Sequence, residues 1–156
     1  MAIQKMVRVD YRLIHGQIVA KWIKSRSIDR IIVADDELVK DEFMSDIYKM
    51  AVPNMDVDIV KIEDLDKALD KKNDKVMLIF RNIANAKKAI DIGVGLFELN
   101  VGAVESSQDR SLITSGISLS EKEIITLKEL KGKGLNVYLQ AIPENDPISL
   151  DNIKIK

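Results

Sequence analysis

The chain of 156 residues contains no cysteine, which excludes disulfide bonds and thiol catalysis and is compatible with a reducing compartment. It has a single histidine, so a conventional zinc site is not expected. Neither sign of charge is in excess, and a formal net charge of -1 supplies no general attraction to nucleic acid or to anionic lipid. We therefore expect no metal site and no nucleic-acid partner.

Long apolar runs are missing as well. No segment approaches the roughly 20 apolar residues of a membrane span, and residues 1–6 acquire a lysine too early for a secretory signal. We expect a cytoplasmic protein that does not insert into a membrane. With 46% hydrophobic and 31% charged residues, and with no repeat, low-complexity tract or linker, residues 1–156 are predicted to form a single domain.

Short apolar runs alternate with helical patterns over the first two thirds of the chain. Such alternation is typical of parallel strands joined by helical crossovers, and an uninterrupted apolar run suits a strand buried on both faces. We predict an α/β fold, with a mainly parallel open sheet and helices on both faces. The expected strands cover residues 6–9, 30–34, 57–62, 76–80 and 97–101, and the expected helices cover residues 17–24, 41–50, 65–69 and 84–92.

The last third of the chain is less regular. Residues 105–119 are rich in serine and threonine and are predicted to form a loop with short extended pieces. Ser120 and Glu123 have the spacing of a capping box, which predicts that a helix begins there. The other expected segments are extended pieces around residues 112–113 and 117–119, the helix to about residue 131, a strand over residues 137–141, and a surface tail, marked by Pro143 and Pro147, that ends near residue 153.

The only histidine, His15, stands where the first apolar run gives way to a helical pattern, in the segment Val-Asp-Tyr-Arg-Leu-Ile-His-Gly-Gln-Ile of residues 9–18. A strand-to-helix turn presents its side chains at an exposed edge, beside unpaired N–H groups that favour phosphate binding. A neutral imidazole is also a good nucleophile near neutral pH. His15 is thus a candidate catalytic residue; the alternative is a half-buried histidine bonded to the backbone.

The neighbours of His15 suit phosphoryl transfer. Arg12 can bind the equatorial oxygens of a phosphoryl group in a fork, Gly16 lets an anion approach the backbone, and Gln17 adds an uncharged donor. Asp10 ends the first strand and can orient Arg12 or His15. Its alternative role is that of a turn or capping carboxylate.

Further polar residues follow other predicted strands. In a parallel sheet such residues collect at one edge, where open α/β sheets bind their ligands. We interpret Asn82, Asn100 and Gly102 as candidate phosphate-binding or partner-binding residues of that edge, where Asp35, Asp36 and Arg81 also belong. Asn82 can instead cap the following helix, and residues 100–102 can form a simple turn.

Two other classes of protein compete with this interpretation. The pair Asp35-Asp36 suggests a receiver-like regulatory domain that binds magnesium and is phosphorylated on aspartate. A charged turn before a helix explains the same pair. A receiver also needs a separate acceptor aspartate at another strand end, and the runs that end at residues 62 and 80 lead into Glu63-Asp64 and Arg81 without an obvious candidate. A dinucleotide-binding module is the third possibility, although no G-x-G-x-x-G motif follows the first strand.

The segment Val-Arg-Val-Asp-Tyr-Arg-Leu-Ile-His-Gly-Gln, residues 7–17, closely resembles the phosphorylation-site segment of the B component (enzyme IIB) of the mannose/fructose/sorbose class of the bacterial sugar phosphotransferase system. Residues 30–36, 49–53, 76–82 and 99–102 follow in the order of that family, so the resemblance covers essentially the whole chain. Tyr11 and Ala103 depart from the residues that many relatives carry at these positions.

The resemblance implies a protein-Nπ-phosphohistidine–sugar phosphotransferase. His15 receives a phosphoryl group on Nδ1 from a phosphohistidine of the IIA component and gives it to a sugar presented by the membrane IIC/IID complex, with which the chain associates peripherally. Arg12 and the helix N-terminus stabilise the transferred group. The resemblance also implies no organic cofactor and no metal.

Overall fold

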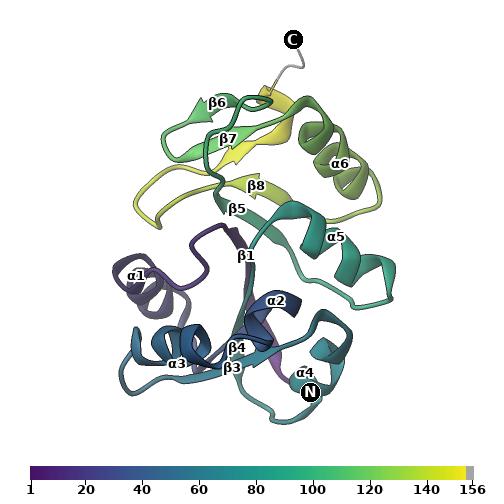
Figure 1. Cartoon of the computed structure of the whole chain (residues 1–156). Helices are drawn as coiled ribbons and strands as arrows, with labels where there is room; N and C mark the ends of the chain where they lie inside the picture. Colours follow the sequence, from purple (N-terminus) through teal and green to yellow (C-terminus); the bar gives the residue numbers. More distant parts are fainter. Residues whose placement is uncertain (154–156) are drawn as a thin grey trace.

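The computed structural model describes residues 1–153, in which a seven-stranded sheet is flanked by helices and a small two-stranded sheet lies at one end (Figure 1). The strands are β1 (Ile3–Asp10), β2 (Arg30–Ala34), β3 (Asp56–Val60), β4 (Lys75–Phe80), β5 (Leu99–Ala103), β6 (Ser111–Thr114), β7 (Ile117–Leu119), β8 (Val137–Leu139) and β9 (Ile148–Ser149). The helices are α1 (Gly16–Arg26), α2 (Asp36–Val39), α3 (Glu42–Met50), α4 (Leu65–Asp70), α5 (Ile83–Asp91) and α6 (Glu121–Gly132), with 3-10 turns η1 (Ile62–Asp64) and η2 (Leu150–Asn152).

The large sheet has the strand order β3-β2-β4-β1-β5-β8-β9. All neighbouring strands are parallel except β9, which runs antiparallel to β8. The predicted mainly parallel open sheet is therefore confirmed. Because β1 lies near the middle of this sheet, the turn that follows it has the ends of β4 and β5 on either side.

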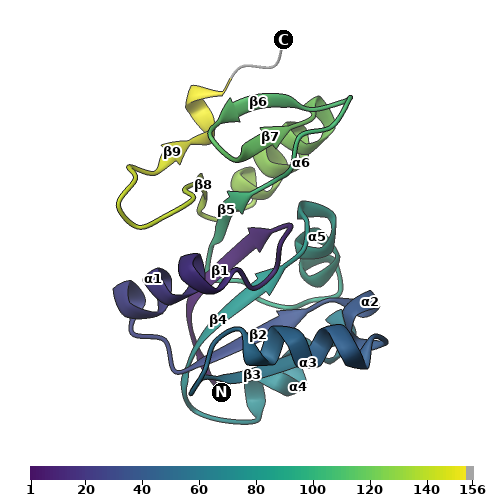
Figure 2. The same ribbon diagram turned by 60° about the vertical axis from the view of Figure 1, so that its left-hand side comes forward.

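Helices cover both faces of the sheet, as predicted (Figures 1 and 2). The central strand β4 shows why: Val76, Leu78 and Phe80 belong to the core beneath α4, α5 and α6, whereas Met77 and Ile79 belong to the core beneath α1 and α3. All five side chains have no exposed area. An uninterrupted apolar run is what a strand with two covered faces requires.

Most predicted elements are present with shifted ends. Strand β1 begins earlier than expected, β5 begins at Leu99 instead of residue 97, and a short helix α2 precedes the expected α3. The extended pieces around residues 112–113 and 117–119 pair as the hairpin β6–β7. Helix α6 opens with the predicted capping box of Ser120 and Glu123.

The predicted surface tail is wrong. Ile148 and Ser149 form β9 on the edge of the sheet, and η2 follows it. Leu150 and Ile153 are buried in the core, with 0% and 5% of their surface exposed. These apolar residues cover the end of the sheet beside α6. Pro143 and Pro147 suggested a surface tail because prolines are common in exposed turns, but they do not show that the segment after them is buried.

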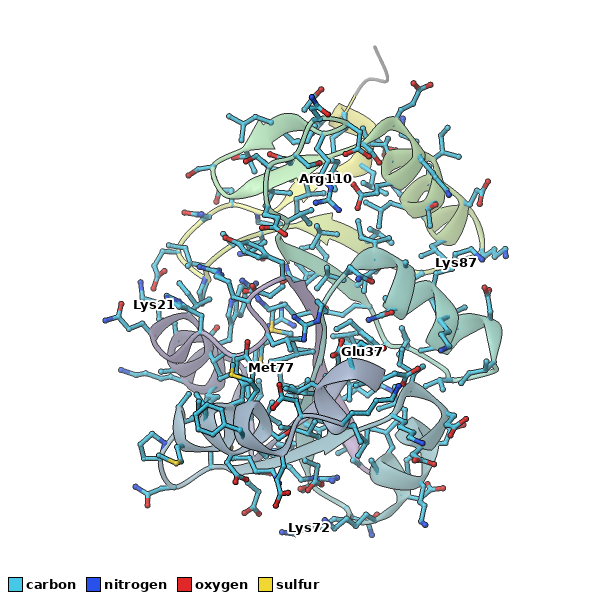
Figure 3. All side chains as sticks on the ribbon, viewed as in Figure 1. Lys21, Glu37, Lys72, Met77, Lys87 and Arg110 are labelled. Atoms are coloured by element: carbon cyan, nitrogen blue, oxygen red, sulfur yellow. The ribbon has the colours of Figure 1, made fainter. Side chains whose placement is uncertain are left out.

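The carboxyl ends of the parallel strands share one edge, since Val9 of β1 pairs with Phe80 of β4 and with Val101 of β5. Lys72, by contrast, precedes β4 and projects from the opposite edge (Figure 3). Within residues 1–153, no helix has the length and apolar character needed to cross a membrane.

Candidate functional site

The turn between β1 and α1 is tight and firmly anchored. The N–H of Leu13 donates to the carbonyl of Asp10 at 2.9 Å, and Leu13 has a left-handed backbone with φ of 58°. This conformation costs a leucine roughly 1–2 kcal/mol, so it persists only where packing enforces it. The side chains of Leu13 and Ile14 are buried, and His15 follows them at the exposed start of the helix.

His15 is the N-cap residue of α1, yet its side chain does not cap the helix. Its backbone is extended, its carbonyl accepts the N–H of Val19 at 3.0 Å, and its imidazole makes no capping hydrogen bond. The N–H groups of Gly16, Gln17 and Ile18 have no hydrogen-bond partner within residues 1–153. An exposed imidazole therefore stands beside free donors at the positive end of a helix of 11 residues, an arrangement that favours an anion.

Gly16 has a structural role in addition to the access that the sequence suggested. A Cβ atom at this position would lie 3.1 Å from the carbonyl oxygen of Ala51, which follows α3. Glycine therefore lets the start of α1 pack against the end of α3. Gln17 is exposed in the first turn of α1, where the sequence placed it.

Asp10 holds Arg12 in a fixed orientation. The buried carboxylate accepts the backbone N–H of Arg12 at 2.9 Å, and its two oxygens accept Nε and Nη2 of the same residue, each at 3.1 Å. This hydrogen bonding raises the pKa of Arg12 above its ordinary value. One third of the Arg12 side chain is exposed, so a cation is presented to solvent three residues before His15. Of the roles predicted for Asp10, the structure shows the contact with Arg12.

Arg8 is a residue that the sequence did not single out. Only 1% of it is exposed, and it donates to the side chains of Asn100 at 2.7 Å and Asp10 at 3.2 Å. It also donates to the carbonyls of Gln140 at 3.1 Å and Ala141 at 2.9 Å. Burial lowers the pKa of Arg8, and Asp10 opposes this effect. The sequence did contain one indication of a buried charge here, because Arg8 stands between two valines in an otherwise apolar run.

Asn100 and Gly102 lie within β5, not after it, so their predicted place in a loop or a turn is wrong. Asn100 has no exposed surface and binds Arg8 and the carbonyl of Gln140. A Cβ atom on Gly102 would lie 2.0 Å from Cζ of Arg8. Both residues shape the space that holds the guanidinium of Arg8, because β5 extends further along β1 than the sequence pattern indicated.

The two acidic residues after β2 are engaged in structural contacts. Asp35 caps α2 by accepting the N–H of Leu38 at 2.9 Å, and it binds Nε and Nη2 of Arg81, both at 3.1 Å. Asp36 accepts the N–H of Ile62 at 2.9 Å and Nζ of Lys88 at 2.8 Å. These contacts agree with a charged turn before a helix. In the described part of the chain, no three His, Asp or Glu side chains are arranged to hold a metal ion.

Asn82 caps the helix that follows β4. Its side chain accepts the N–H of Asn85 at 2.8 Å, which is the alternative role stated above. Since β4 is the neighbour of β1, Asn82 and Arg81 still lie at the same edge of the sheet as Asp10. Their contact with a phosphoryl group or a partner stays a prediction.

Comparison with known proteins gives a consistent result. The model of the family "PTS system sorbose subfamily IIB component" matches residues 4–156. The sorbose-specific EIIB component of Lacticaseibacillus casei is 32% identical over 151 residues, which cover 92% of this chain and 90% of that protein. The crystal structure of manxB from Thermoanaerobacter tengcongensis superposes with a TM-score of 0.90 at 40% identity, covering 97% of this chain and 94% of that one.

A third relative is longer than this chain. The mannose-specific EIIAB component of Escherichia coli K12 is 27% identical over 146 residues, which cover 91% of this chain and 45% of that protein. With its fold, its exposed histidine and these matches, the chain belongs to the sorbose-type IIB family of the phosphotransferase system. It is a IIB component of the mannose/fructose/sorbose class and works in sugar phosphotransfer.

Proposed function

We propose that the chain is a phosphocarrier that takes a phosphoryl group on His15 from the IIA component and gives it to a sugar at the IIC/IID complex. The observation that carries this proposal is the exposed imidazole at the uncapped N-terminus of α1, with Arg12 held nearby by Asp10. The resemblance of residues 7–17 to the family's phosphorylation segment supports the same assignment.

The chemistry consists of two in-line displacements at phosphorus. In the first, Nδ1 of His15 attacks the phosphoryl group, and the nitrogen–phosphorus bond of the donor breaks. In the second, a sugar hydroxyl attacks, the bond to His15 breaks, and a base of the membrane partner takes the proton of the hydroxyl. Arg12 and the free N–H groups of the first turn of α1 stabilise the equatorial oxygens in both steps.

Both partners have to reach the same atom. Each must bring its reacting atom within about 3–3.5 Å of the imidazole nitrogen, so their footprints overlap around His15. The name of the Escherichia coli relative joins an A and a B component, which supports a IIA donor for this chain. A cytoplasmic chain that associates peripherally with the IIC/IID complex meets both requirements.

Phosphorylation with labelled phosphoenolpyruvate and the general phosphotransferase components, together with the IIA component, tests this proposal. We expect label on His15, labile in acid and stable in base, and no label on His15→Ala. The variant should unfold with little change in free energy, because an exposed residue makes few buried contacts. Label that base and hydroxylamine remove would instead indicate an aspartyl phosphate and the receiver-like alternative.

A further inference from the structure

Three charged residues around Asp10 form one connected cluster, Arg8–Asp10–Arg12. The carboxylate of Asp10 is shared: one oxygen accepts Nε of Arg12, and the other accepts Nη2 of both Arg12 and Arg8. The side chains of Arg8 and Asp10 are 1% and 2% exposed, whereas that of Arg12 is 33% exposed. Arg12 is therefore the only member of the cluster that a phosphoryl group or a partner can reach.

The two arginines also differ in how firmly they are held. Arg8 makes four hydrogen bonds, fills the space left by the missing side chain of Gly102, and lies 5.7 Å from the ring centroid of Trp22. Arg12 has only Asp10 as a hydrogen-bond partner among the described residues and lies 5.6 Å from the Tyr11 ring. Arg12 can change its partner without disturbing the core, and Arg8 cannot.

We propose that Arg8 is a positioning residue for phosphoryl transfer, which neutralises Asp10 so that Arg12 can leave this carboxylate for the phosphoryl group on His15. The inference rests on the proposed function. A phosphoryl dianion competes with Asp10 for the guanidinium fork of Arg12. Without Arg8, departure of Arg12 would leave a buried carboxylate with no countercharge, which is strongly unfavourable. With Arg8 in place, Asp10 keeps a partner at 3.2 Å, and Arg12 is free to move.

The rate of phosphorylation by the IIA component tests this role in two variants. Arg8→Met removes the cation and retains much of the side-chain volume, so Arg12 is left as the only countercharge of Asp10. We expect transfer to slow by about tenfold or more, as expected when a group that binds the reacting phosphoryl is misplaced. Adding Asp10→Asn removes the charge that retains Arg12. We expect the double variant to be phosphorylated at least about threefold faster than Arg8→Met alone.

Neutralising Asp10 can also restore stability, because it removes a buried carboxylate that has lost a countercharge. The free energy of unfolding of both variants is therefore measured beside the rate, and a rate that falls and recovers in fully folded protein separates positioning from a structural role. Arg30→Met is the matched control. Arg30 is 2% exposed and pairs with Asp58 and Asp74, but these contacts lie at the opposite edge of the sheet. The Arg30→Met variant should have a lower free energy of unfolding, and its folded form should be phosphorylated at the wild-type rate.

The results distinguish this inference from the proposed function. If wild-type protein does not carry label on His15, both fail. If wild-type protein is labelled and Arg8→Met reacts at the wild-type rate, or the double variant shows no recovery, only the role of Arg8 is overturned.

A measurement on wild-type protein decides the matter if Arg8→Met does not fold. The Nε–H resonance of Arg12 and the Nη–H resonances of Arg8, whose Nη groups make its hydrogen bonds, can be followed by NMR before and after phosphorylation. We expect the Arg12 resonance to move as it changes partner, while the Arg8 resonances stay protected from exchange with solvent. An unmoved Arg12 resonance, or loss of protection at Arg8, would overturn the inference.

Discussion

Asp10 is the residue on which the candidate site depends most, because it orients the exposed Arg12 and is itself held by the buried Arg8. The four hydrogen bonds that its carboxylate accepts come from one backbone and two side-chain donors of Arg12 and from one donor of Arg8. At the scale of single residues, the site is thus an ion cluster that exposes one guanidinium in the same β1–α1 connection as one exposed imidazole.

Replacing Arg12 by lysine should slow phosphoryl transfer without changing the fold. Lysine keeps the charge but cannot form the fork that now binds both oxygens of Asp10. We expect the barrier to rise by about 1–3 kcal/mol, the range for a charge-assisted hydrogen bond. Single-turnover rates and circular dichroism spectra of the two proteins measure this, and wild-type rates would show that Arg12 is only a surface charge.

Replacing Gly102 by alanine should displace Arg8. The backbone of Gly102 is outside the left-handed region, so the effect comes from the added methyl group, which would lie 2.0 Å from Cζ of Arg8. We expect the free energy of unfolding to fall by about 3 kcal/mol, together with slower transfer. Urea unfolding measures the first effect. The control is Gly95→Ala, where no atom lies within 4 Å, and its stability should stay within about 0.5 kcal/mol of wild type. Equal effects of the two changes would contradict the packing around Arg8.

His15, Arg12 and Asp10 could be identified from the sequence because they are neighbours in one turn, and local spacing is what a sequence displays. The role of Arg8 could not, because its partners Asn100 and Gln140 are distant in the chain and meet it only through the order β1-β5-β8. The same pairing explains why Gly102 was misplaced: β5 continues along β1 to Ala103, past the expected end of this strand at residue 101.

At the scale of elements, α1 differs from four of the other five helices in how it begins; the fifth, α4, also lacks a side-chain cap and follows directly on η1. Helices α2, α3, α5 and α6 each begin with a side chain that caps the first turn, whereas the N-cap of α1, His15, leaves its imidazole unused. Capping residues satisfy the first N–H groups of a helix, so an uncapped start keeps these donors available for a ligand. The β1–α1 connection therefore combines a rigid turn with an open helix end.

Helix α6 offers the opposite case, because its start is closed by a complete capping box. Replacing Ser120 by alanine removes the oxygen that accepts the N–H of Glu123 at 3.1 Å. We expect the free energy of unfolding to fall by about 1 kcal/mol, measured in urea, with no change in the rate of phosphoryl transfer. Slower transfer in this variant would show that the start of α6 belongs to the functional site.

At the scale of the whole molecule, most of the parallel sheet and its covering helices were predictable, since continuous apolar runs and helical patterns alternate in the chain. Strand β9 was not, because it has two residues and is fixed by pairing with β8 and by burial of Leu150 and Ile153. Strand order was also absent from the sequence pattern. Strand order depends on which strands each helical connection joins side by side in the sheet. The hydrophobic periodicity of a segment predicts its secondary structure but not its neighbours.

The stability of the molecule should fall in strong alkali because of Tyr138. Burial, and then the hydrogen bond to Glu98, raise its pKa to about 12. In the unfolded chain tyrosine ionises near pH 10, so between about pH 10 and 12 the unfolded state loses a proton that the folded state retains. Below pH 10 both states keep this proton, so Tyr138 does not lower the free energy of unfolding there. By pH 11.5 we expect the free energy of unfolding to have fallen by about 2 kcal/mol.

Urea unfolding at pH 9.5 and at pH 11.5 measures this loss. Tyr138→Phe has no proton to lose, so the difference between the two pH values should be smaller than in wild type, even though the variant lacks the bonds to Glu98 and Arg26. An equal fall in both proteins would contradict the assignment to Tyr138.

The central claim is that His15 carries the phosphoryl group, and the presence of one histidine in the chain permits a direct measurement. Protein labelled with nitrogen-15 in histidine shows the nitrogen resonances of that one imidazole. After phosphorylation through the IIA component, we predict that Nδ1 shifts and shows coupling to phosphorus. Unchanged resonances of both nitrogens, in protein that mass spectrometry shows to carry a phosphoryl group, would contradict the claim.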